Sequence, residues 1–200
     1  MKEPQLPGFQ EIQACLRSHQ PILKRTAGKR CAATALIFHP SHETPLEILL
    51  IERSRRTDDP WSGHFSLPGG HPEPQDGDLA ATARREAWEE VGIELGAPLG
   101  RLDDIETTGG TGAHVSPFIF AVESPPHLQL DSKEVHQALW IPVSWILNPR
   151  SAHTHRSDRH GQPRGYPAVR YQGNVIWGLT YRTLENFFRV LGYGLPRAEV

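Results

Sequence analysis

The chain has 200 residues, enough for one domain with a full hydrophobic core. Its 21 basic and 23 acidic residues give a formal net charge of −2, which excludes a strong overall field for nucleic acid or an anionic membrane. No apolar run is close to the length of about 18 residues that a membrane-spanning helix needs, and the N-terminus lacks the apolar core of a signal peptide. We therefore expect a cytoplasmic protein without a membrane partner.

The first 30 residues are expected to form an N-terminal extension to a domain over residues 31–200. An amphipathic helix is expected near Phe9 to Ser18, because Ile12 and Leu16 fall on its apolar side. We expect that side to pack either on the domain or on a second copy of the chain. A homodimer is therefore one option.

Two apolar runs of strand length come next, Cys31 to Phe38 and Leu46 to Ile51, with a polar segment between them. They predict a hairpin in a mixed sheet. Arg53 emerges from the end of the second run, and Arg55 and Arg56 follow. Because arginine binds phosphate oxygens in a bidentate way, we expect Arg53 to bind substrate beside an acidic metal site, while the other two are solvated.

Two turns follow these strands. The first, residues 58–63, carries Trp61, which either stacks on a nucleobase or covers the core. The second, Leu67 to Gly70, ends in two glycines, which allow a backbone path that side chains would block. A backbone carbonyl of Gly69 or Gly70 is expected to point inward and complete the coordination shell of a metal ion.

A single helix is predicted between Asp78, which caps its start, and Gly92, which ends it. Small alanines form one stripe, and Glu86, Glu89 and Glu90 share a neighbouring arc of about 100°. Convergent carboxylates are hard oxygen ligands suited to Mg²⁺ or Mn²⁺. The alternative is a solvated glutamate-rich face, on which like charges four residues apart cost a few tenths of a kcal/mol.

The remaining chain alternates apolar runs with polar turns. The polar segment 151–165, rich in histidine and arginine, is expected to be a mobile loop that touches phosphates rather than a metal site. Strands are expected over Pro98–Thr107, His114–Glu123, Ala138–Ile141, Pro167–Tyr171 and Asn174–Trp177, with a glycine turn at 109–112 and helices around Val143–Leu147 and Gly178–Gly192.

The run from Arg85 to Ile93, REAWEEVGI, resembles the second half of the Nudix hydrolase signature, G-x5-E-x7-R-E-U-x-E-E-x-G-U, with U an aliphatic residue. Relative to Gly70 the box is one residue longer, which makes its early acid Asp76 or Asp78. The resemblance covers roughly residues 31 to 192. It implies an α/β fold, an α/β/α sandwich with a mixed β-sheet and a catalytic loop-helix-loop.

The resemblance also implies metal-dependent hydrolysis of a phosphoanhydride in a nucleoside diphosphate derivative, a small-molecule nucleotide substrate. Glu86, Glu89 and Glu90 would ligate Mg²⁺ or Mn²⁺, and Arg85 would orient the carboxylates. Many Nudix enzymes place a further acid before the strand that follows Glu134, where it ligates metal or acts as the base. The base is therefore either a helix glutamate or Glu134.

One branch of the family, which hydrolyses coenzyme A and its thioesters, is also similar outside the box. Its LL-x-x-R-[SA] motif is matched at Leu49–Ser54 and its G-x3-F-P-G-G motif at Gly63–Gly70, with Leu67 for phenylalanine, and Asp59 stands where the branch has an arginine. An IWG run before the last helix is a further likeness. Coenzyme A or an acyl derivative is the leading substrate. The alternatives are ADP-ribose, dinucleotides, nucleotide sugars or nucleoside triphosphates, a nucleotide-sensing module, or a purely structural glutamate-rich helix.

Overall fold

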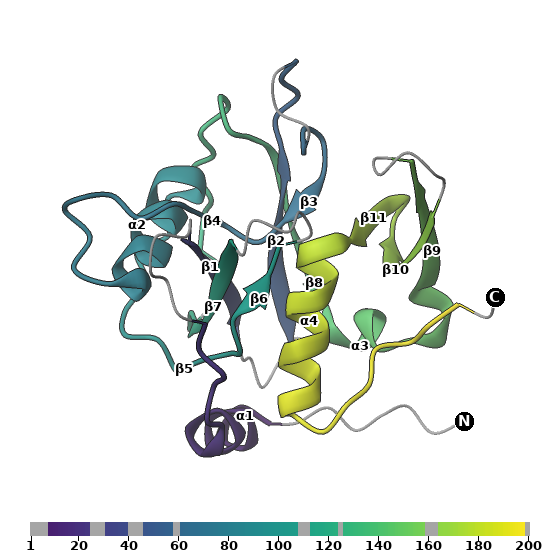
Figure 1. Cartoon of the computed structure of the whole chain (residues 1–200), viewed down its shortest axis with the longest axis horizontal. Coiled ribbons are helices and arrows are strands. Elements are labelled where there is room, and N and C mark those ends of the chain that lie inside the picture. The colour runs from purple at the N-terminus through teal and green to yellow at the C-terminus, as the bar shows by residue number, and fades with distance from the viewer. Residues whose placement is uncertain are drawn as a thin grey trace.

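A computed structural model describes residues 8–24, 31–39, 46–57, 61–107, 113–123, 126–158 and 164–198. Within these ranges the chain forms two β-sheets with helices around them (Figure 1). The Asp59 position and the 109–112 glycine turn lie outside the described residues. The helices in the described ranges are α1 (Phe9–Ser18), α2 (Leu79–Val91), α3 (Val143–Ile146) and α4 (Gly178–Val190), together with a 3-10 turn, η1 (Pro149–Ser151).

The main sheet has eight strands and is mixed, as predicted. Its centre is β1, which runs parallel to β7 and antiparallel to β2. Phe38 lies opposite Ile48, so the predicted hairpin is confirmed. The strands are β1 (Cys31–His39), β2 (Glu47–Arg53), β3 (Phe65–Ser66), β4 (Gly69–Gly70), β5 (Gly100–Arg101), β6 (Ile105–Glu106), β7 (His114–Ala121) and β8 (Val135–Pro142).

Both faces of the main sheet are buried, which explains why its central strands are continuous apolar runs. Ala35 and Ile37 of β1 pack with α2 on one face, while Leu36 and Phe38 pack with α1, α3 and α4 on the other. This alternation along one strand produces two cores. The predicted α/β/α sandwich is thereby confirmed. Among the described helices none is long and apolar enough to cross a membrane.

A second, three-stranded antiparallel sheet lies beside the main one (Figure 1). Its strands are β9 (Ala152–Ser157), β10 (Arg164–Tyr171) and β11 (Asn174–Trp177). The prediction of a mobile loop at 151–165 is therefore wrong for residues 152–157, while 159–163 lie outside the described part. The polar sequence hid this strand because backbone pairing with β10, rather than burial of β9 side chains, forms it.

The N-terminal helix packs on the domain, which was one of the two predicted arrangements. Ile12 and Leu16 of α1 are buried in the core beside α4, and Phe9 meets Phe38 edge to face at 6.2 Å. This packing does not test the predicted boundary at residue 31 or the homodimer, and both stay predictions.

The predicted strand from Pro98 to Thr107 is split into β5 and β6. Asp103 and Asp104 separate the two pieces, and their carboxylates accept backbone N–H groups from the N-terminal segment. Ile22 N donates to Asp103 at 2.9 Å, and Lys24 N donates to Asp104 at 2.7 Å. A long-range contact of this kind overrides the local preference for one continuous strand.

Candidate active site

Helix α2 has the predicted ends and the predicted buried stripe. The Asp78 carboxylate accepts the Ala81 N–H at 2.7 Å, and Gly92 adopts the left-handed conformation with φ 72° that stops the helix. Ala83 and Ala87 are fully buried where α2 packs on β1. The small side chains let the helix lie close to the sheet, and this fixes the direction of its glutamates.

The three glutamates of α2 differ strongly in exposure. Glu90 is 2% exposed, whereas the side chains of Glu86 and Glu89 are 13% and 53% exposed. The Glu90 carboxylate accepts the Gly69 N–H at 3.0 Å. Glu90 therefore lies at the floor of the site, with Glu86 above it and Glu89 at the rim, and all three line one cavity.

Both glycines of β4 are closely packed, and Gly69 is required because its neighbours are backbone atoms. A Cβ on Gly69, whose φ is 156°, would collide with the Ala33 carbonyl and with Thr34, because β4 pairs directly with β1. A Cβ on Gly70 would collide with the Glu86 carboxylate. The turn therefore lies against the α2 glutamates. The inward role of a Gly69 or Gly70 carbonyl stays a prediction, since the contact that the structure gives uses the Gly69 amide.

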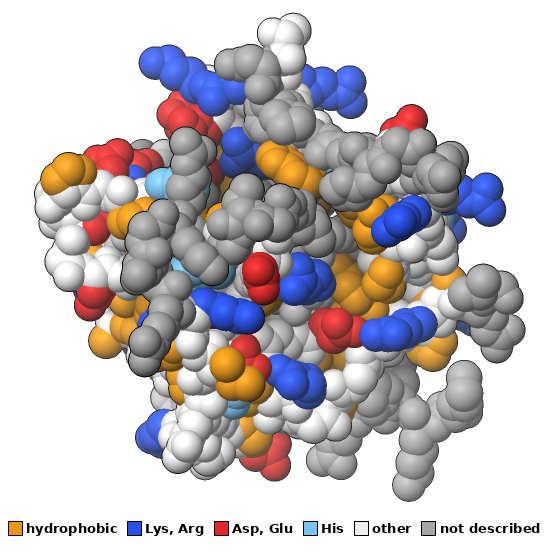
Figure 2. All heavy atoms as spheres, in the orientation of Figure 1, with side chains coloured by type: hydrophobic (Ala, Val, Ile, Leu, Met, Phe, Trp, Pro, Cys, Tyr) orange, Lys and Arg blue, Asp and Glu red, His pale blue; other side chains and the backbone are white. Residues whose placement is uncertain are grey.

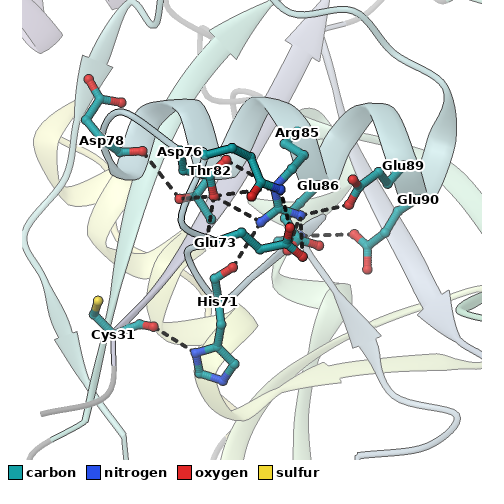
Figure 3. Close-up of polar contacts among 12 residues, drawn as sticks. Cys31, His71, Glu73, Asp76, Asp78, Thr82, Arg85, Glu86, Glu89 and Glu90 are labelled. Carbon is teal, nitrogen blue, oxygen red and sulfur yellow. Dashed lines mark hydrogen bonds and ion pairs between the residues drawn. The ribbon is translucent and has the colours of Figure 1, made fainter.

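Arg85 contacts several oxygen groups of the loop before α2 and of α2 itself (Figure 3). Its Nη1 contacts Glu89 Oε2 at 2.8 Å and Glu86 Oε1 at 3.0 Å, while its Nε lies 3.1 Å from Asp76 Oδ1. Its Nη2 donates to the His71 carbonyl at 2.9 Å. The planar guanidinium matches several oxygens at once. The expected role of Arg85 in orienting the carboxylates stays a prediction.

The structure separates the two candidates for the early acid. The Asp76 side chain is 5% exposed and accepts hydrogen bonds from Arg85, from Thr82 Oγ1 at 2.9 Å and from Glu73 N at 2.9 Å. The hydrogen bonds from Arg85 lower the pKa of Asp76 to about 2. Asp78 instead caps α2 and belongs to the helix start. Asp76 is thus the acid that reaches the glutamate cluster through Arg85.

Charges converge at the buried end of this cluster. Burial, helped by the nearby charges of Glu86 and Glu134, raises the pKa of Glu90 to about 8, although the hydrogen bond from Gly69 and the charge of Arg53 lower it. Burial also raises the pKa of Glu86, with the charge of Glu134 again contributing. Hard carboxylate oxygens held close together against their mutual repulsion fit a divalent cation.

The described residues contain no group of three or more His, Cys, Asp or Glu already arranged as a metal site. The ion pairs of Arg85 account for part of this, since they engage Glu86 and Glu89. The assignment of Glu86, Glu89, Glu90 and Gly69 as ligands therefore remains a prediction based on donor chemistry.

The segment after β2 connects the predicted arginine to the predicted acid loop. Arg53 lines the cavity at the end of β2. The next residue, Ser54, donates its N–H to the Glu134 carbonyl at 2.8 Å and its hydroxyl to the Ser132 carbonyl at 3.0 Å. The Asp131 N–H in turn donates to the Glu90 carbonyl at 3.1 Å. Arg53 and Glu134 are thus held at the same site, although their catalytic roles stay predictions.

A cavity of about 1520 Å³ joins this cluster to the second sheet. Sequence reasoning missed several residues of its lining because they come from segments expected to be loop or core. The IWG likeness was the one available signal, and it pointed to a segment without giving Trp177 a role. The missed lining residues include His64, Asp131, Tyr166, Trp177, Thr180 and Arg182.

The surface shown in Figure 2 carries basic and acidic side chains that alternate over short distances. Among the described side chains on that face, neither sign forms a broad continuous patch.

Comparison with known proteins agrees with this geometry. The model of the NUDIX domain family matches residues 28–159. A protein named uncharacterized Nudix hydrolase NudL, from Photorhabdus laumondii, is 36% identical over 150 residues, covering 73% of this chain and 78% of that protein. The peroxisomal coenzyme A diphosphatase ndx-8 of Caenorhabditis elegans is 32% identical over 127 residues, covering 62% of this chain and 53% of that protein.

A crystal structure of a MutT/nudix family protein from Enterococcus faecalis matches with a TM-score of 0.55 at 14% identity, covering 94% of this chain and 76% of that one. At this low identity the match shows a similar fold and nothing more. The chain spans between 33% and 83% of the length of the first curated relatives it matches, and about half of the worm protein. The family match over more than half of the sequence, together with the NudL relative, leads to one conclusion: this chain belongs to the Nudix family.

Proposed function

We propose that this chain hydrolyses the internal diphosphate of coenzyme A or of an acyl-coenzyme A, with Mg²⁺ or Mn²⁺ as the cofactor. The observation that carries hydrolysis is the convergence of Glu86, Glu90 and Glu134 beside Arg53 in one large cavity. A solvated, purely structural glutamate face would not bury a carboxylate to 2% exposure.

The balance of charge in the cavity supports the need for a cation. Its lining includes six acidic side chains, those of Glu73, Glu86, Glu89, Glu90, Asp131 and Glu134, against the three arginines Arg53, Arg85 and Arg182. A diphosphate would be repelled by this excess of carboxylates unless divalent cations neutralised it. Glu86, Glu89 and Glu90, with a carbonyl of Gly69 or Gly70, are the residues that would hold the metal. When bound, the metal lowers the pKa of water and neutralises charge on the diphosphate.

The chain's own residues have separate tasks in this proposal. Arg85 fixes the directions of the Glu86 and Glu89 carboxylates through its ion pairs. Arg53 binds phosphate oxygens by its guanidinium fork. The proton of the attacking water passes either to a helix glutamate or to Glu134.

Coenzyme A is preferred over other substrates on three grounds. The Leu49–Ser54 motif brings Arg53 to the cavity and joins it to the Glu134 loop. The IWG segment places Trp177 in the same cavity. The worm relative is named a coenzyme A diphosphatase. That relative is also named peroxisomal, so the cytoplasmic location expected for this chain stays a prediction.

A substrate panel tests the proposal. The purified chain is offered coenzyme A, acetyl-coenzyme A, ADP-ribose, NADH, diadenosine polyphosphates and nucleoside triphosphates, with Mg²⁺ or Mn²⁺. We expect fastest cleavage of the coenzyme A compounds, with 3′,5′-ADP and a phosphopantetheine as products. Efficient turnover of ADP-ribose or a triphosphate with negligible action on coenzyme A would overturn the substrate assignment. No turnover of any compound, despite tight metal binding, would favour a nucleotide-sensing module.

A further inference from the structure

Four of the aromatic side chains that line the cavity on elements other than α2 form a cluster, which we call the aromatic wall. They are Trp61 and His64, which precede β3, Tyr166 of β10 and Trp177 of β11. In Figure 1 the second sheet and α2 lie on opposite sides of the molecule. The cavity that both elements line therefore has a carboxylate side and an aromatic side.

The rings of the aromatic wall are in contact with one another. His64 lies 5.8 Å from Trp61 and 5.2 Å from Trp177, measured between ring centroids. The Trp177 ring lies 5.6 Å from Tyr166 and 6.5 Å from Trp61. These separations are those of favourable aromatic pairs. The wall is thus one cluster of neighbouring rings, tilted or edge-to-face to one another, rather than a set of scattered rings.

The second sheet holds this surface in place. Tyr166 lies opposite His155 and Ala168 lies opposite Trp177, so alternate positions of β10 bring His155, Tyr166 and Trp177 to one face. The His155 ring stacks on Trp177 at 3.9 Å with an angle of 29° between the planes. The unexpected strand β9 therefore has a clear consequence, since it fixes the Trp177 ring.

The wall is not part of either hydrophobic core. Trp61 is 47% exposed, and neither core cluster includes Trp61, Tyr166 or Trp177. An exposed tryptophan in a cavity, flanked by further rings, offers a flat apolar surface to a ligand. Two roles were predicted for Trp61, stacking on a nucleobase and covering the core. The exposure of its side chain favours stacking.

The size of the cavity indicates a ligand with more than a diphosphate. Ligand pockets commonly measure about 300–1,000 Å³. At about 1520 Å³ this cavity exceeds that range, so a diphosphate at the carboxylates leaves the aromatic side unfilled. A nucleobase has a flat π-face on both sides, and every base can stack on an aromatic side chain.

We propose that the aromatic wall binds the nucleobase of the substrate by stacking, with Trp61 as the main platform. This inference rests on the proposed function in that the diphosphate of the same molecule lies at the α2 carboxylates. Binding by the wall itself requires no bond cleavage. It can therefore be measured separately from hydrolysis.

The test compares AMP with ribose 5-phosphate, which lacks the base, by isothermal titration in the presence of Mg²⁺. The variants are Trp61→Leu, which keeps an apolar side chain without a ring, and Trp61→Phe, which keeps a ring. Trp88→Ala is the matched control, because Trp88 is 58% exposed on α2 and does not line the cavity. Circular dichroism melts check that each variant is folded.

We expect the wild-type chain to bind AMP roughly 5- to 100-fold more tightly than ribose 5-phosphate. Trp61→Leu should lose most of that preference, while Trp61→Phe and Trp88→Ala keep it. An unchanged preference in Trp61→Leu, or no preference or no AMP binding in the wild type, would overturn the proposal. If coenzyme A is not hydrolysed but the AMP preference depends on Trp61, the proposed function fails and the wall stands. If Trp61→Leu still hydrolyses coenzyme A with unchanged KM and keeps the AMP preference, the proposed function stands and the proposed role of the wall fails.

Discussion

Asp76 is the residue whose substitution best tests the architecture of the lengthened box. Its carboxylate is nearly buried and accepts hydrogen bonds from Arg85, Thr82 and Glu73. Asp76→Asn keeps the shape of the side chain and removes the charge that Arg85 contacts. We expect the variant to fold but with a lower free energy of unfolding.

The magnitude follows from the pKa. A shift of the Asp76 pKa from 3.8 to about 2 is worth about 2 kcal/mol at roughly 1.4 kcal/mol per unit. Because the pKa is lowered in the folded state, this stability is present above pH 3.8 and is lost as the pH falls through about 2. Urea unfolding at pH 7 should show a midpoint lower by roughly 1 M, at a slope of about 2 kcal/mol/M. The difference between the wild-type chain and the variant should shrink at the acid end.

Asp78→Asn is the matched control for this experiment. It makes the same chemical change two residues away, and asparagine caps a helix about as well as aspartate. The variant should therefore unfold like the wild-type chain within about 0.5 kcal/mol. If Asp78→Asn destabilised as much as Asp76→Asn, or if the Asp76→Asn difference persisted unchanged to pH 2.5, the assignment of Asp76 as the early acid would be wrong.

Three further predictions concern the glutamates and their neighbours. Burial raises the pKa of Glu90 from 4.5 to about 8, so the free energy of unfolding of the metal-free chain should fall as the pH rises between these values. In chemical denaturation over the same pH range, the free energy of unfolding of Glu90→Gln should fall less. Gly70→Ala should displace Glu86 and weaken Mn²⁺ binding at least about 10-fold by titration, whereas Gly77→Ala, where a Cβ meets nothing within 4 Å, should leave it unchanged. Arg53→Ala should raise the KM for coenzyme A about 10-fold or more in steady-state assays; an unchanged KM would exclude Arg53 from phosphate binding.

The helix α2 could be predicted from sequence because its signals are local. The Asp78 cap, the alanine stripe and Gly92 lie within one short stretch, and the structure reproduces both helix ends. The mixed sheet could also be predicted, since the buried strands β1 and β2 are continuous apolar runs. Local capping and periodicity therefore determine which residues share one face of the helix.

The aromatic side of the cavity could not be predicted because it depends on contacts between distant segments. His155 lies in a polar stretch without hydrophobic alternation, and it becomes a strand only through pairing with β10. Likewise, the choice between Asp76 and Asp78 depended on the path of the loop to Arg85, which spacing alone does not fix. The exposure of the three glutamates also differs for a tertiary reason, the position of β4 against Glu90.

The most direct test of the central claim measures metal binding and hydrolysis in the same samples. Mn²⁺ titration calorimetry and release of 3′,5′-ADP from coenzyme A are compared for the wild-type chain, Glu90→Gln and Trp88→Ala. We predict that Glu90→Gln remains folded but loses Mn²⁺ affinity and turnover together, while Trp88→Ala, on the exposed face of the same helix, keeps both. Wild-type Mn²⁺ affinity and full turnover in Glu90→Gln would contradict the assignment of the α2 carboxylates as the catalytic metal site.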